Sequence, residues 1–174
     1  MIAPLSLSNV LTVFVAFACL HTIAPQSRGG VVKLWRLAVP ACFAAVEALV
    51  LLAGVFDATF GHDAEWVVAA LIGILLGRMR GWSMPVEVDR MWELVRLRPS
   101  LDGQAAALAL IALSFIDFTS AALEQPIIAC DHVAAGASLF AGYLGGRAVA
   151  IAVRAMRAPH VELQPQRRRA DFSA

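Results

Sequence analysis

Charged residues are scarce in this sequence: Asp, Glu, Lys and Arg make up 16% of its 174 residues, whereas soluble domains usually contain about 25%. Hydrophobic residues make up 60%, and the mean hydropathy is +0.73. This apolar excess is too large for one globular core. It is distributed in blocks of roughly twenty residues, the length that crosses the hydrocarbon layer of a bilayer. We therefore predict one integral membrane domain and no separate soluble domain.

Cysteine and recognisable catalytic motifs are also scarce. The three cysteines lie in or beside apolar blocks and form no CxxC pair, which argues against a disulfide framework. The sequence contains no Gly-rich phosphate loop, HExxH, GxSxG or Cys/His set with metal-ligand spacing. We therefore assign no catalytic residue, metal site or cofactor. The basic residues have few aromatic neighbours, so we expect no binding to nucleic acid.

Five apolar blocks are long enough to be membrane spans. We place them at residues 5–24, 37–60, 66–81, 104–123 and 127–153, followed by a basic tail at 154–174 that is expected to be disordered. Pro25 is expected to end the first helix, and Trp66 and Trp82 bracket the third as interfacial aromatic residues do. The predicted fold is an all-α integral membrane protein, a five-span helical bundle.

Lys and Arg are absent from the N-terminus and from the second and fourth loops between the predicted spans. All 14 lie in the first loop, in the third loop, or at the end of the last span and in the tail. With five spans, these three regions share one side of the membrane. The positive-inside rule then predicts a multi-pass protein of the bacterial inner membrane with a periplasmic N-terminus and a cytoplasmic C-terminus.

Residues 84–98, in the third loop, fit either a short amphipathic hairpin or a surface helix. As strands, Glu87 and Asp89 would lie opposite Arg96 and Arg98, with valine and leucine on the other face. As a helix, the segment would lie on the membrane through an apolar stripe of Val88, Met91, Trp92 and Val95. The Pro-Val-Glu-Val opening favours the hairpin. Anionic lipid headgroups are expected to contact Arg78, Arg80, Arg96 and Arg98.

Glycines recur at close-packing intervals in two predicted spans. Gly73, Gly77 and Gly81 share one face of the third span, and Gly142 and Gly146 form a pair in the fifth. Small residues at such spacing let membrane helices approach closely. We expect the third and fifth spans to pack through these glycines, which could also serve a membrane-protein partner or a homo-oligomer.

Ionisable residues inside the predicted spans form a candidate polar cluster: Glu47, Asp57, Asp117, Asp131 and His132. Helix rise places Glu47 near the midplane and the other four in the outer half. Such groups are costly in a membrane and are candidates for function. In one interpretation they bind a cation or pass protons inward through Glu47. In the other, each aspartate reaches water or caps a helix, and Glu47 makes a buried hydrogen bond to another helix.

The third loop resembles a segment of the CcdC-like bacterial membrane proteins, named for cytochrome c biogenesis. In that family a helix that ends in Gly and Arg precedes a short cytoplasmic Val-x-Val-Asp hairpin. The matching residues here are Gly77, Arg78, Arg80, Gly81, Val86, Val88 and Asp89. The resemblance covers about thirty residues, implies a bacterial multi-span fold and identifies no catalytic residue.

Two functions from different classes remain open. The first is a non-enzymatic inner-membrane protein, an accessory or assembly partner of a membrane complex, because few polar groups are available for a substrate pathway. The alternative is a small cation or proton transporter that uses the intramembrane carboxylates. An enzyme acting on lipid or quinone near Trp82 and Trp92 would need a convergent acid/base pair, which the sequence does not offer.

Overall fold

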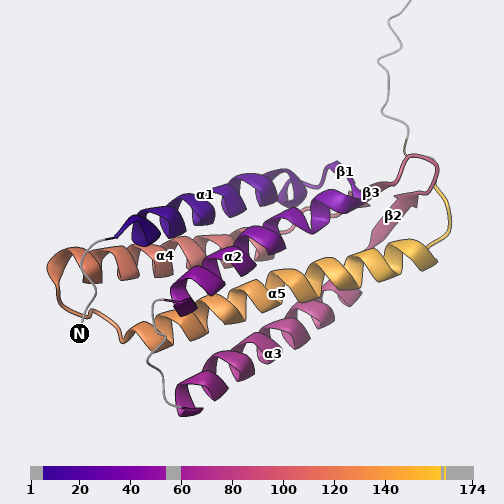
Figure 1. Ribbon diagram of the computed structural model, residues 1–174. Helices are drawn as coiled ribbons and strands as arrows, with labels where there is room; N and C mark the ends of the chain where they lie inside the picture. The colour runs from indigo at the N-terminus through magenta and orange to yellow at the C-terminus, as the bar shows by residue number, and fades with distance from the viewer. Residues whose placement is uncertain (1–5, 54–59, 162, 164–174) are drawn as a thin grey trace, which may run out of the picture.

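The computed structural model describes residues 6–53, 60–161 and 163, which form five α-helices and a small three-stranded sheet (Figure 1). In chain order the elements are α1 Leu7–Ser27, β1 Val31–Lys33, the 3₁₀ helix η1 Leu34–Leu37, α2 Val39–Ala53, α3 Phe60–Ser83, β2 Val86–Asp89, β3 Leu94–Leu97, α4 Asp102–Leu123 and α5 Cys130–Arg157. The predicted all-α fold is therefore supplemented by a sheet.

Four helical segments of the described chain are long and apolar enough to cross a membrane: Leu7–Ser27, Leu34–Ala53, Asp102–Leu123 and Cys130–Arg157. Each contains a window with mean hydropathy between 1.3 and 1.9, as expected for a multi-pass membrane protein. The remaining helix, α3, has 24 residues. Glu65, Arg78 and Arg80 lie close to the ends of the apolar stretch of α3. Helix α3 is not among the four candidate membrane-spanning segments.

The prediction that Pro25 ends the first helix is wrong, because α1 continues to Ser27. Proline removes one backbone donor, but other bonds hold the last turn in place. The Ser27 hydroxyl donates to the Ile23 carbonyl (3.1 Å), and the Gln26 amide donates to the Arg36 carbonyl (2.9 Å). Helix α5 extends to Arg157, four residues beyond the predicted end of the fifth span.

Residues 86–97 form the hairpin rather than the helix. The β2–β3 register places Glu87 opposite Arg96, and their side chains form an exposed ion pair at 3.1 Å. Asp89 lies opposite Leu94 rather than Arg98, and its side chain is buried. The sequence analysis missed strand β1, which pairs antiparallel with β3 and gives the order β1-β3-β2.

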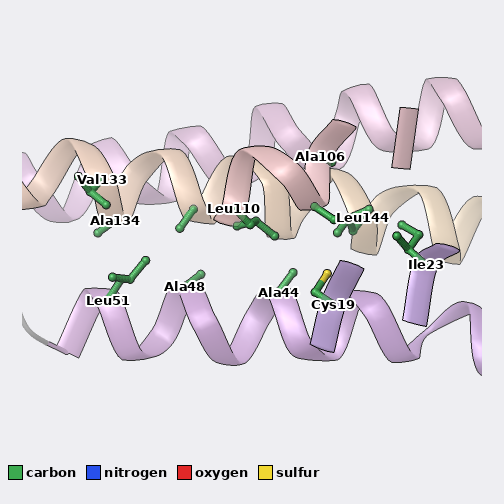
Figure 2. Packing of buried hydrophobic residues seen from close by; sticks show 12 residues of the cluster. Cys19, Ile23, Ala44, Ala48, Leu51, Ala106, Leu110, Val133, Ala134 and Leu144 are labelled. Carbon is green, nitrogen blue, oxygen red and sulfur yellow. The ribbon is translucent and has the colours of Figure 1, made fainter. Parts of the chain in front are cut away.

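Helix α5 lies at the centre of the bundle, where it packs against α2, α3 and α4, while α3 packs mainly against α5 at the edge (Figure 1). Figure 2 shows Ala44, Ala48 and Leu51 of α2 directed toward the helix that carries Val133 and Ala134. A second apolar cluster joins the sheet to the last turns of α5: Val32, Leu37, Met84, Val88, Val95, Leu97, Ile151 and Ala155. The sheet therefore closes one end of the bundle.

Candidate functional site

The densest polar centre in the described residues is built around Asp102, at the start of α4. Its Oδ2 accepts hydrogen bonds from the Tyr143 hydroxyl (2.9 Å) and Arg80 Nε (3.2 Å), and Arg147 Nε lies 3.3 Å away. The Ser100 hydroxyl donates to Oδ1. These residues come from α3, α4, α5 and the segment before α4. The Asp102 carboxylate therefore connects three helices at the sheet end of the bundle.

Helix geometry explains how this centre forms. Tyr143 and Arg147 are four residues apart on α5 and share a face, and the α4 N-terminus favours an acidic residue. Glycine at position 103 leaves room for its neighbours, because a Cβ there would lie 2.6 Å from Ile23 Cδ1 and 3.3 Å from Arg147 Nη1. Arg147 is only 4% exposed, and the Asp102 side chain is 17% exposed. This arrangement is a buried ion pair that can fix the helices relative to one another.

The sequence analysis missed this centre. It assigned Arg80 to lipid headgroups, whereas Arg80 contacts Asp102. It counted Arg147 only among the basic residues of one side of the membrane. The available signal was that Arg147 lies inside the predicted fifth span, where a charge needs a partner.

Glu47 lies on α2 and is fully buried, with 0% exposure. Its Oε1 accepts a hydrogen bond from the Ser114 hydroxyl of α4 at 2.6 Å. Its Oε2 is also buried and has no hydrogen-bond partner in the described part of the chain. The bond between α2 and α4 is the arrangement expected in the second interpretation of the intramembrane carboxylates.

The other described residues of the predicted polar cluster contact partners on other helices or on their own helix. Asn9 of α1 donates to Asp117 Oδ2 (2.8 Å). His132 Nδ1 lies 2.9 Å from Glu65 Oε1 and 4.0 Å from Asp131 Oδ2. The ligand atoms of this α3–α5 trio lie within 4.8 Å of one another, a spacing that a metal ion could bridge, although Glu65 and His132 are exposed.

The predicted cluster is thus distributed over several helix pairs. The contacts join α2 to α4, α1 to α4 and α3 to α5. Asp57, the fifth predicted member, lies outside the described residues. The geometry favours separate helix–helix bonds over one shared ion site.

The five predicted packing glycines meet at one interface between α3 and α5. A Cβ at Gly73 would overlap the carbonyl of Leu139, one at Gly77 that of Tyr143, and one at Gly81 would meet Ala150 Cβ at 2.7 Å. On α5, a Cβ at Gly142 would overlap the Ala70 carbonyl and one at Gly146 the Ile74 carbonyl. The protein's own helices therefore use these glycines.

The four arginines assigned to headgroups have different surroundings. Arg80 binds Asp102, and Arg96 forms its exposed pair with Glu87. Arg78 and Arg98 are exposed, and neither forms an ion pair or hydrogen bond within the described residues. These two are the arginines of the set that can bind an external anion.

A lateral groove of about 770 Å³ runs between α2 and α3, with α5 as its floor. Trp66 and Trp82 line it toward opposite ends of α3. Alanines and glycines line much of the rest, and Arg78 is the one charged side chain among the described lining residues. An apolar surface of this kind suits a hydrophobic molecule or segment.

Asp89 joins the hairpin turn to the chain after α5. Its Oδ1 accepts from the N–H groups of Met91 (3.1 Å) and Trp92 (3.4 Å), and its Oδ2 from the N–H of Leu163 (3.1 Å). Leu163 is 1% exposed, and the Val161 N–H donates to the Val88 carbonyl at 2.8 Å. The sequence analysis placed this segment in a disordered tail, whereas residues 158–161 and 163 are packed on the sheet.

Replacing Asp89 with Ala is expected to lower the free energy of unfolding by about 1–3 kcal/mol, because three backbone donors lose a buried charged acceptor. The amide hydrogens of Val161 and Leu163, which are bonded to Val88 and Asp89, should exchange faster. Hydrogen exchange with mass spectrometry and thermal unfolding measure both effects. Glu87→Ala is the control on the same strand, and its half-exposed ion pair should contribute under about 1 kcal/mol. Equal effects of the two substitutions would contradict the role of Asp89.

Comparison of the chain with protein-family models, with curated proteins and with solved structures gives no match. The resemblance to CcdC-like proteins therefore stays a prediction. The contacts described above are the basis for a functional proposal.

Proposed function

We propose that this protein is a non-enzymatic, five-span protein of the bacterial inner membrane that serves as an accessory or assembly partner of a membrane complex. The observation that carries the proposal is how the ionisable side chains are used. Asp102 with Arg147, Glu47 with Ser114 and Asp117 with Asn9 each join two helices of the bundle. Groups used in this way stabilise packing rather than line a substrate pathway.

The position of the sheet supports five crossings. Strand β1 follows α1, the β2–β3 hairpin follows α3, and the segment that pairs with β2 follows α5. The ends of α1, α3 and α5 therefore lie at one end of the bundle (Figure 1). This arrangement requires α3 to run back along the bundle after α2. The basic residues of the hairpin and of the end of α5 support a cytoplasmic position for this end.

The alternative function is a small cation or proton transporter, which is favoured by one observation, the buried and unpartnered Glu47 Oε2. A buried carboxyl group with free hydrogen-bonding capacity can exchange a proton. Glu47→Gln separates the two functions, because glutamine keeps the side-chain shape and still accepts the Ser114 hydrogen bond.

We expect purified wild-type protein in liposomes to dissipate an imposed pH gradient no faster than protein-free liposomes. Glu47→Gln should then leave both this rate and the activity of the membrane complex in cells unchanged. An internal pH dye measures the rate, and Glu87→Gln on the exposed face of β2 is the control. Rapid dissipation by the wild type that is lost in Glu47→Gln alone would replace the proposed function with the transporter.

Isolation of the protein in native membrane discs tests for a partner. The proposal expects a stoichiometric membrane partner that cross-links to the protein in intact cells. A lone monomer, recovered without cross-links, would contradict it.

A further inference from the structure

We propose that the groove between α2 and α3 is a binding site for an anionic phospholipid, with one acyl chain along the groove and the phosphate on Arg78. This inference is independent of the proposed accessory function. It rests on the chemistry of the lining, the length of the groove, an open glycine on its floor and an unpaired arginine.

The lining of the groove is matched to a hydrocarbon chain. The α2 wall is formed by alanines and leucines, and the α3 wall by apolar side chains such as Ala70 and Ile74. Ser138 and Arg78 are the polar side chains of the described lining apart from the tryptophans at its ends. A carbohydrate or a polar metabolite would leave most of its hydrogen-bonding groups unpaired in such a groove.

The groove is long enough to hold the acyl chain of one leaflet. Trp66 and Arg78 are twelve residues apart on α3, which is about 18 Å along the helix axis. Half of a hydrocarbon core of about 30 Å is about 15 Å. An acyl chain that starts beside Arg78 and crosses one leaflet therefore fits within the part of the groove between Arg78 and Trp66.

Gly145 indicates that the floor of the groove leaves space for a ligand. The glycines on either side, Gly142 and Gly146, are held against α3, whereas a Cβ at Gly145 would meet nothing within 4 Å. Glycine within a helix costs about 1 kcal/mol relative to alanine, and no contact inside the described bundle explains it here. A bound acyl chain that crosses the groove floor at this point would explain why position 145 is glycine.

Arg78 indicates that the ligand is anionic. The side chain is exposed, has no partner in the described part of the chain and borders the groove one helical turn before Trp82. Tryptophan marks the membrane interface, so the flexible Arg78 side chain can reach the headgroup level. Guanidinium binds phosphate through two parallel hydrogen bonds. The described lining contains no carboxylate that would bind the cationic group of a zwitterionic headgroup or of a partner helix.

The test uses the full-length protein in detergent, titrated with phosphatidylglycerol or with phosphatidylcholine of the same acyl chains. Native mass spectrometry counts the bound lipids, and thermal unfolding reports their stabilising effect. We expect one tightly retained phosphatidylglycerol and a higher melting temperature with that lipid than with phosphatidylcholine. Arg78→Gln should weaken phosphatidylglycerol binding about tenfold, the effect of losing a charge-assisted contact.

Gly145→Leu tests the groove itself. The leucine side chain would not overlap the neighbouring helices, but it would occupy the groove. Binding of both lipids should therefore be lost, while the lipid-free protein still folds. Arg98→Gln removes an exposed, unpaired arginine outside the groove, and Ala112→Leu enlarges an exposed alanine on α4. Both control variants should bind the lipids as the wild type does.

Equal affinity for the two lipids, unchanged binding by Gly145→Leu, or equal losses in Arg78→Gln and Arg98→Gln would overturn the inference. A groove filled by a second copy or by a partner helix instead of lipid would also overturn it.

Discussion

Asp102→Asn is expected to lower the free energy of unfolding by about 3–5 kcal/mol, the cost of removing one member of a buried ion pair. Asparagine can still accept the Tyr143 hydrogen bond. It cannot compensate the charge of Arg147, which is 4% exposed and 3.3 Å from the carboxylate. Reversible unfolding in mixed micelles, followed by circular dichroism, measures the loss.

Two further variants determine whether the uncompensated charge is the cause. Arg147→Met in the Asp102→Asn background removes that charge and should recover much of the lost stability, since an apolar replacement of a buried pair is often neutral. Arg80→Gln should cost under about 1 kcal/mol, because the Arg80 side chain is 46% exposed. If the double variant is less stable than Asp102→Asn alone, the buried-charge explanation is wrong.

Gly77→Ala is expected to produce the second large effect, a loss of about 1–3 kcal/mol or more from overpacking. The new methyl group would overlap the Tyr143 carbonyl, which belongs to the α5 backbone and cannot rotate away. Because α3 packs mainly against α5, its displacement would also move Arg80 away from Asp102. Thermal unfolding and amide exchange within α3 report the change.

Gly145→Ala is the matched control, because it makes the same chemical change on α5, the helix against which α3 packs. Its Cβ meets nothing within 4 Å, so only helix propensity acts, and stability should stay equal or rise by up to about 1 kcal/mol. Similar behaviour of Gly77→Ala and Gly145→Ala would show that the α3–α5 interface tolerates extra volume and that close backbone approach is not needed.

The helices could be predicted because their length and apolar composition are local properties of the sequence. Their ends were less predictable. The helix continues for two residues after Pro25, and the side chains of Gln26 and Ser27 donate hydrogen bonds to the carbonyls of Arg36 and Ile23. Strand β1 has three residues, and it forms because β3, more than sixty residues later, offers an edge. Such pairing leaves no periodic pattern in the short segment itself.

The polar contacts illustrate the same limit. Depth along a helix can be estimated from residue counts, and that estimate placed Asp117, Asp131 and His132 in one outer layer. Rotation about the helix axis decides the partners, and it directs Asp117 toward Asn9 and His132 toward Glu65. Asp102 and Arg147 are 45 residues apart, and the sequence gives no indication that they pair. The groove depends on how α2 and α3 diverge over α5, which only the assembled bundle determines.

The sheet also sets an order of events during biosynthesis. Val31 of β1 pairs with Arg96 of β3, so β1 leaves the ribosome with its partner still to be made. At synthesis rates of about 5–20 residues per second, β1 waits roughly 3–13 seconds. During that interval its unpaired edge is exposed to other chains. Slow translation through α3 would lengthen this exposure, whereas a chaperone or the membrane surface that covers residues 31–33 would protect the nascent chain.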